Sequence, residues 1–244
     1  MNTTQENYNK FLNEALYKYY TKDIFLTIYG KIPKQRDYTF TYCIDFLEKR
    51  DNIQIAELGT SRSFVDGKFD GVCCNDTKYW SPDNPEKWDW SAGIFTKYFS
   101  TILNDKGKKF KITSVDIDKT ALSISKKITE NLNEFIEFKL CSSEEYIKNQ
   151  PKKSLDILYL DTGNMDEETA LLHLREAKLL IEHQIIKDDG IILIDDVRNP
   201  AMVLKFKENN KYGKSKYAIP FFLENGYEII IDEYQVVLKK YIFS

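Results

Sequence analysis

Acidic side chains end four apolar segments of this 244-residue chain, and they are its first candidates for chemistry. Short apolar segments bounded by polar loops are typical of buried parallel strands. In an open α/β sheet, ligands bind in the crevice beyond the carboxyl ends of the strands. We therefore expect the acids to share one rim of a sheet. The segments begin at residues 53, 112, 155 and 191, and their acids are Glu57, Asp116, Asp161, Asp195 and Asp196.

Asp161, Asp195 and Asp196 form a group that could hold a metal ion. Adjacent parallel strands lie about 4.8 Å apart, so acids at neighbouring strand ends can converge on one point. Carboxylates this close repel one another and raise one another's pKa values, a cost that a divalent cation removes. Mg²⁺ and Ca²⁺ prefer such all-oxygen ligands. The alternative is that Asp161 contacts only a cofactor, while Asp195 and Asp196 cap a helix or carry surface charge.

Asp116 and Gly59 indicate a nucleoside cofactor. A carboxylate at a strand end can accept hydrogen bonds from both hydroxyls of a ribose, which would suit NAD, FAD or S-adenosylmethionine. Gly59 ends the first apolar segment, where the backbone must come close to another group. A dinucleotide site requires Gly-x-Gly-x-x-Gly to cradle the pyrophosphate, whereas residues 59–63 contain one glycine. A cofactor without phosphates fits this pattern better.

Alternating strands and helices must position these residues. The alternation predicts an α/β fold with a parallel sheet and right-handed crossovers, closed by an antiparallel hairpin. Residues 1–50 are expected to form an N-terminal helical appendage, and residues 51–244 a single domain. The predicted helices are 6–20, 37–49, 91–103, 119–131, 143–149 and 167–183, and the predicted strands are 53–59, 112–116, 135–140, 155–160, 191–195, 227–231 and 234–238.

Residues 64–90 interrupt this alternation with an aromatic insertion that contains Trp80, Trp88 and Trp90. A loop of this length in a compact domain is usually functional or disordered, and disordered segments are poor in aromatic residues. The rings could anchor the loop on the domain. They could also form a lid or wall that stacks on a substrate, and both roles can hold together.

From about residue 53 to the final hairpin, the chain resembles the class I S-adenosylmethionine-dependent methyltransferases. The segment Glu57-Leu58-Gly59-Thr60 is similar to the family's glycine-rich first motif, with Ser63 where a further glycine is common. Asp116 matches the acid that binds the ribose, and Cys141-Ser142-Ser143 matches the loop beside the adenine. The resemblance implies a Rossmann-like fold, with a mostly parallel seven-stranded sheet, a C-terminal antiparallel hairpin and helices on both faces. It also implies S-adenosyl-L-methionine as cofactor, bound by Glu57, Gly59, Thr60, Ser61, Ser63, Asp116, Ile117, Ser142, Ser143 and Asp161.

Asp161 with the pair Asp195 and Asp196 resembles the metal site of divalent-cation-dependent O-methyltransferases, especially the macrocin-type group that methylates sugar hydroxyls. This implies transfer to a hydroxyl of a sugar, a glycan or another polyhydroxylated small molecule, assisted by Mg²⁺ or another divalent cation. Related enzymes place a base just beyond the first metal acid, but Gly163 and Asn164 stand there. The catalytic candidates are Asp161, Asp166 and Asp196, with His173 a weaker one, and the substrate-binding candidates are Trp80, Trp88, Trp90 and Arg198.

Two other functional classes stay open. One is a metal-independent methyltransferase that acts on nitrogen or on a protein, and the other is a non-catalytic scaffold of the same fold. A nicotinamide dehydrogenase is disfavoured by the glycine pattern. Arg36 precedes the central crevice and could reach a ligand, but an arginine at a helix start is more often solvated. A basic run is expected to form a solvated face, and it consists of Lys205, Lys207, Lys211, Lys214 and Lys216.

Charge and composition narrow the choice of partners and compartment. The net charge is -3 and the basic residues are scattered, which argues against a nucleic-acid partner. No apolar stretch approaches the length of a membrane span, and residues 1–10 lack a signal-peptide core. The four cysteines lack zinc-site spacing, so we expect a reducing, cytoplasmic location. The N-terminal helix and the aromatic insertion could each mediate a homodimer.

Overall fold

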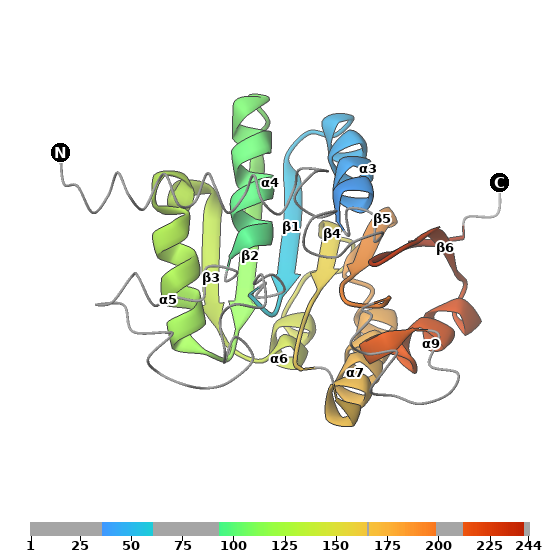
Figure 1. The fold of residues 1–244 in the computed structure, drawn as a ribbon. Helices are drawn as coiled ribbons and strands as arrows, with labels where there is room; N and C mark the ends of the chain where they lie inside the picture. Colours follow the sequence, from blue (N-terminus) through green and yellow to red (C-terminus); the bar gives the residue numbers. More distant parts are fainter. Residues whose placement is uncertain (1–35, 61–92, 165, 199–211, 242–244) are drawn as a thin grey trace, which may run out of the picture.

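The computed structural model describes residues 36–60, 93–164, 166–198 and 212–241, which form a seven-stranded sheet covered by helices (Figure 1). Five strands pair in parallel, and the last strand along the chain runs antiparallel to both of its neighbours. In spatial order the strands are β3 (Ile136–Leu140), β2 (Phe110–Asp116), β1 (Ile53–Leu58), β4 (Leu155–Leu160), β5 (Ile186–Ile194), β7 (Val236–Lys240) and β6 (Tyr227–Asp232).

The central strands are buried on both faces, which explains why they are apolar almost without interruption. All six residues of β4 are buried. The one acid within it, Asp156, is compensated at the amino end of the strand by Arg50 and Lys187, each with a nitrogen 2.8 Å from its Oδ1. A strand of this kind requires helices on both faces of the sheet.

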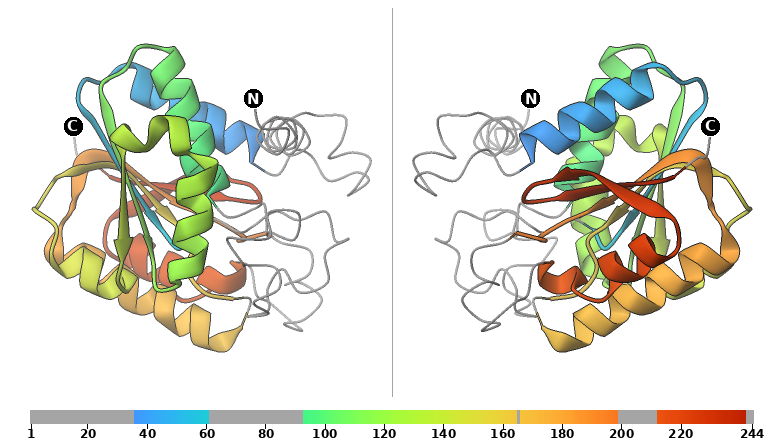
Figure 2. Two further views of the ribbon diagram at one scale, coloured as in Figure 1. Left: turned by 90° about the vertical axis from the view of Figure 1, so that its left-hand side faces the viewer. Right: turned by 90° about the vertical axis from the view of Figure 1, so that its right-hand side faces the viewer.

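Two helical layers provide this cover, and Figure 2 shows the sheet between them. One layer contains α3 (Asp37–Glu48), α4 (Ile94–Asp105) and α5 (Lys119–Ile128), with the short helix η3 (Glu130–Phe135). Its core is aromatic, because Phe40, Phe95 and Phe99 pack around Tyr159 of β4. The other layer contains α6 (Ser143–Lys148), α7 (Glu167–His183) and α9 (Ala218–Glu224), which bury aliphatic side chains and Phe222.

Three helices begin directly beyond strand ends, and each begins at a side-chain cap. Asp118 accepts hydrogen bonds from two backbone amides at the start of α5. Ser142 caps α6, and Asp166 caps α7 by accepting from the amide of Thr169 at 2.8 Å. Such caps stabilise a helix start by about 1 kcal/mol each. They also fix the loops that follow β2, β3 and β4, which form the rim of the sheet.

The seven strands, the parallel order and the terminal hairpin confirm the predicted fold class. The long helix was predicted at its observed bounds, Glu167–His183, while β5 begins at Ile186, five residues before the predicted start. Helix α9 was not predicted. Helix α3, in the segment set apart as an appendage, packs on the sheet through Phe40, Cys43 and Leu47. The predicted helix 6–20 and the insertion 64–90 lie outside the described residues.

Within the part of the chain that the structure describes, no helix is long and apolar enough to cross a membrane.

Candidate active site

Asp116 lies at the carboxyl end of β2, where two backbone amides fix its carboxylate. Its Oδ2 accepts a hydrogen bond from the amide of Thr60 at 2.9 Å, and its Oδ1 accepts from the amide of Asp118 at 2.8 Å. Because a carboxylate oxygen can accept more than one hydrogen bond, Asp116 can also accept hydrogen bonds from a ligand. The turn after β1 and the end of β2 therefore form one polar corner.

An apolar surface lies beside this carboxylate. Ile117 follows Asp116 directly and is 77% exposed, and Leu140, which pairs with Asp116 across the two strands, is 56% exposed. Ser142 and Ser143 continue from that strand end into α6. A carboxylate next to exposed apolar side chains suits a nucleoside, with the ribose on the acid and the flat base on the apolar groups.

Glu57 lies below this corner and is fully buried. Its Oε2 accepts hydrogen bonds from Thr96 of α4 and Ser114 of β2, both at 2.5 Å. These contacts join β1 to its neighbours, so the side chain supports the turn at Gly59. The structure thus gives Glu57 a positioning role, although the sequence placed it among the residues that bind the cofactor.

Gly59 brings the polar corner against the end of β4. Its φ is +81°, and a Cβ at this position would lie 2.5 Å from the backbone oxygen of Asp161. No other residue type fits this approach without a shift of the backbone. The predicted nucleoside corner and the predicted metal acids are therefore direct neighbours.

Asp161, Asp195 and Asp196 come together as predicted: one carboxylate oxygen from each lies within 4.8 Å of the others. We call these three side chains the carboxylate cluster. Asp195 follows the last residue of β5, and its amide donates to the carbonyl of Leu160 in β4. Asp196 has φ of +55°, which ends the strand and keeps two successive acids at the same point.

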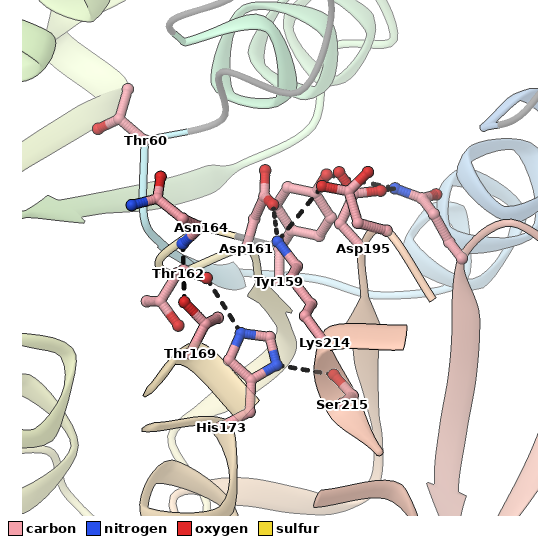
Figure 3. A network of polar contacts seen from close by, with 12 residues as sticks. Thr60, Tyr159, Asp161, Thr162, Asn164, Thr169, His173, Asp195, Lys214 and Ser215 are labelled. Atoms are coloured by element: carbon pink, nitrogen blue, oxygen red, sulfur yellow. Dashed lines mark hydrogen bonds and ion pairs between the residues drawn. The ribbon is translucent and has the colours of Figure 1, made fainter. Parts of the chain in front are cut away.

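Two buried cations face the carboxylate cluster, and the sequence predicted neither. Arg36 is 3% exposed and binds Asp195 with two nitrogens, at 3.1 and 2.7 Å. Lys214 is 2% exposed, and its Nζ lies 2.6 Å from Oδ1 of Asp161 and 3.5 Å from Oδ2 of Asp196. The prediction that both are solvated was wrong, because their segments fold back over the strand ends from far away in the sequence. Figure 3 shows Lys214 reaching Asp161 from the side of Ser215.

The turn between β6 and β7 completes the surroundings of the carboxylate cluster. Tyr234 donates its hydroxyl to Asp196, and its ring lies under the guanidinium of Arg36, 4.8 Å from centroid to Cζ. Gln235 donates to Asp195 at 2.8 Å and to the hydroxyl of Tyr159 at 3.2 Å. The hairpin is thus part of the site as well as an edge of the sheet.

These partners set the charges of the site. Burial disfavours the charged form of Asp195, but Arg36 and Lys214 outweigh it and lower its pKa to about 2. Burial raises the pKa of Asp161 well above its usual value, and Lys214 opposes this rise. Burial alone would lower the pKa of Lys214, yet the carboxylates, Asp161 foremost, raise it above the usual lysine value. Lys214 therefore remains an ammonium at neutral pH and cannot serve as a base.

His173 lies beneath the carboxylate cluster and packs there as a neutral ring. Its Nε2 is 3.1 Å from the carbonyl oxygen of Thr162 and its Nδ1 is 2.7 Å from Oγ of Ser215 (Figure 3). Because a carbonyl only accepts, Nε2 carries the proton and Nδ1 accepts from Ser215. Burial lowers the pKa of His173 to about 3. This agrees with the low weight given to His173 as a base.

The other predicted site residues lie apart or outside the described part. Asp166 caps α7 and does not belong to the carboxylate cluster. Arg198 pairs with Asp232 and lies over the ring of Tyr212, 5.2 Å from its centroid, so its place in substrate binding is not supported by these contacts. The predicted residues outside the described ranges are Ser61, Ser63, Trp80, Trp88 and Trp90.

Comparison with known proteins places this geometry in context. Residues 90–197 match a family model described as a methyltransferase domain. No curated protein matches the chain. A crystal structure of a protein from Corynebacterium glutamicum is similar, with a TM-score of 0.55, 11% identity and 99% of each chain covered. A candidate caffeoyl-CoA O-methyltransferase from Staphylococcus aureus gives a TM-score of 0.52 and 14% identity over 95% of this chain and 98% of that one.

Proposed function

We propose that the chain, whose residues 90–197 match a methyltransferase domain, is a class I S-adenosylmethionine-dependent methyltransferase, and that it methylates a hydroxyl of a sugar, a glycan or another polyhydroxylated small molecule. The observation that carries the proposal is the close approach of Gly59 to the backbone of Asp161. It puts the polar corner, where the nucleoside is expected to bind, next to the carboxylate cluster. A hydroxyl acceptor needs a group that receives its proton, and acids beside the methyl donor suit that need.

S-adenosylmethionine supplies a methyl group on a positively charged sulfur. Asp116 accepts hydrogen bonds from the ribose hydroxyls, and Ile117 with Leu140 covers the base. Methyl transfer is an in-line displacement, so the main task of the chain is to place the acceptor hydroxyl in reach of the methyl group. The rim beside Gly59 provides that place.

Asp161 is the acid that we assign as proton acceptor. Asp196 receives the hydroxyl of Tyr234, and Asp195 is held by Arg36 and Gln235. Asp161 uses Oδ1 for Lys214, and the described residues form no hydrogen bond to its Oδ2. Burial raises its pKa, which makes it a better acceptor for a hydroxyl proton than an ordinary aspartate.

One observation supports the predicted divalent cation: a carboxylate oxygen from each of the three acids lies within 4.8 Å of the other two. Against it, Asp195 already faces Arg36, and Lys214 faces Asp161 and Asp196. A divalent ion lies about 2.0 to 2.6 Å from its carboxylate oxygens, so it would lie beside the ammonium of Lys214. The residues therefore do not fit such an ion together with Lys214, and we derive no step through one. Metal-assisted transfer, the second candidate, requires Lys214 to leave the cluster, and full activity after chelation would exclude it.

Calorimetry with S-adenosylhomocysteine tests the cofactor half of the proposal. Asp116→Asn removes the charge that binds the ribose and should weaken binding about ten- to a hundredfold, the usual effect of hydrogen bonds to a charged group. Asp118→Asn is the matched control, because Asn also caps α5, and it should bind almost as wild type does. Equal affinity of wild type and Asp116→Asn would contradict the assignment.

Transfer of a deuterated methyl group tests the acceptor half. Wild-type protein with labelled cofactor and a panel of glycosides and other polyols should give a product with the label on oxygen, identified by mass spectrometry and NMR. Asp161→Asn should lower kcat about 10²- to 10⁴-fold while cofactor affinity is retained, as expected for loss of a general base. A label found only on nitrogen would refute O-methylation.

A further inference from the structure

Lys214 lies in a short segment whose packing fixes its position beside the carboxylate cluster. The short helix η4 (Gly213–Ser215) packs on the backbone just after β5. Gly213 has φ of +51°, and a Cβ there would lie 2.6 Å from the carbonyl oxygen of Val197 and 2.7 Å from that of Asp196. This close approach requires glycine, and it places the next residue, Lys214, against Asp196.

The other side of the segment is fixed by α7. Ser215 is fully buried and donates its hydroxyl to the buried ring of His173, which in turn donates to the carbonyl of Thr162 after β4 (Figure 3). Lys214 is therefore flanked by one residue locked on the end of β5 and another locked to the loop after β4. The side chain has a defined position, unlike that of a surface lysine.

The ammonium of Lys214 occupies the place where a bound cation would neutralise the acids. Its Nζ lies 2.6 Å from Asp161 and 3.5 Å from Asp196, and 2% of the side chain is exposed. Burying a lysine is costly unless its charge is paired with acids. Arg36 does the same for Asp195, so three carboxylates face two cations and one negative formal charge remains.

We propose that Lys214 is the resident cation of the carboxylate cluster and excludes a divalent metal from it. The proposal deepens the proposed function, since it rests on this rim as the place where the acceptor binds. The experiment that tests it measures metal binding and needs no methyl acceptor. A metal ion holds an acceptor by chelating two neighbouring hydroxyls, a requirement that does not apply where an ammonium takes the place of the ion. The acceptor therefore needs no second hydroxyl beside the one that is methylated.

Binding of Mn²⁺, followed by electron paramagnetic resonance at pH 8, tests the proposal. Wild-type protein should show no site in this cluster, whereas Lys214→Met should show one whose affinity is at least about tenfold above the weakest that the titration detects, because the repelling charge is gone. Lys216→Met is the matched control: it removes the same charge from a pair with Glu167 outside the cluster, and it should bind as wild type does.

Two results would overturn the proposal. One is a Mn²⁺ site in wild-type protein that Asp161→Asn removes, and the other is equal affinity of wild type and a folded Lys214→Met. If Lys214→Met does not fold, the titration of wild-type protein and of Asp161→Asn still tests the proposal. The proposal requires that wild-type protein has no Mn²⁺ site in the carboxylate cluster. S-adenosylhomocysteine binding, measured on the same samples, separates failure of this proposal from failure of the cofactor assignment.

Discussion

At the scale of single residues, Gly59 has the most demanding position, because two features restrict it. Its φ is +81°, and its Cα faces the backbone of Asp161 without room for a Cβ. A left-handed conformation alone costs a non-glycine residue about 1 to 2 kcal/mol. The close approach adds a steric cost, because both partners are backbone at the ends of buried strands.

The glycines allow these two costs to be separated. Gly226 has the same φ of +81°, and a Cβ there would meet nothing within 4 Å. Gly226→Ala should therefore lower the free energy of unfolding by about 1 to 2 kcal/mol. Gly59→Ala should lower it by about 1 to 3 kcal/mol more, the usual cost of forced overpacking. Urea denaturation measures both, and equal effects would show that Gly59 has more room than the structure gives it.

Residue types alone did not reveal the two buried cations. Lysine and arginine are mostly exposed in proteins, so the expectation for Arg36 and Lys214 followed the general tendency. Their burial depends on acids that are 159 and 53 positions away along the chain. A weak local signal did exist for Lys214, since Gly213 precedes it and Ser215 follows it. Only the fold shows that this glycine lies against Asp196.

At the scale of elements, α7 positions the site through a buried face that changes in character along its length. Near its start the face carries Thr169, His173 and Glu176, which hydrogen-bond to the loop after β4 and to η4. Toward its end it carries Ala177 and Leu180, which pack in the apolar core. The first half orients the site, and the second half anchors the helix on the sheet.

Glu176 makes the stability of α7 depend on pH. Burial raises its pKa from 4.5 to about 7, and it accepts a hydrogen bond from Thr162. Between these values the unfolded chain has released a proton that the folded chain still holds, so the contribution is complete below pH 4.5 and is lost as pH rises through 7.

Glu176→Gln should remove this dependence, since glutamine resembles the protonated acid in shape. The free energy of unfolding of the variant relative to wild type should rise between pH 4.5 and 7, by at most about 3 kcal/mol, and then stay constant. Chemical denaturation of both proteins across this range provides the measurement. A constant difference would mean that Glu176 is ionised in the folded protein.

The elements were largely predictable from the sequence, and their periodicity explains why. The strand 155–160 and the helix 167–183 were predicted at their observed bounds, because a short apolar run and a capped amphipathic segment are strong local patterns. Helix α9 was missed because its seven residues are too few to show a period. The acids of the site were predictable from their strand ends, whereas their partners come from loops and turns without a comparable pattern.

At the scale of the whole molecule, the carboxylate cluster joins parts of the chain that are far apart in sequence. Asp195 receives Arg36 from the start of α3 and Gln235 from the turn before β7. Tyr234 lies against both Arg36 and Asp196. Contacts of this range tie the first described helix to the last strand across the middle of the sheet.

Removing Arg36 should therefore affect stability more than an ordinary surface change would. Arg36→Met leaves Asp195 as a buried charge without its paired cation and should lower the free energy of unfolding by about 3 to 5 kcal/mol. The double variant Arg36→Met with Asp195→Asn removes both charges and should recover part of this loss. Urea denaturation of the four proteins of this cycle gives the coupling energy. Additive effects would mean that the pair does not form in solution.

The β6–β7 turn has a consequence for the order in which the carboxylate cluster gains its partners. During translation, Asp195 and Asp196 are synthesised before Tyr234 and Gln235. Their hydrogen bonds to Tyr234 and Gln235 can form only once the turn between the last two strands has been synthesised. A chain that ends before Tyr234 therefore lacks two of the donors that Asp195 and Asp196 have in the folded protein.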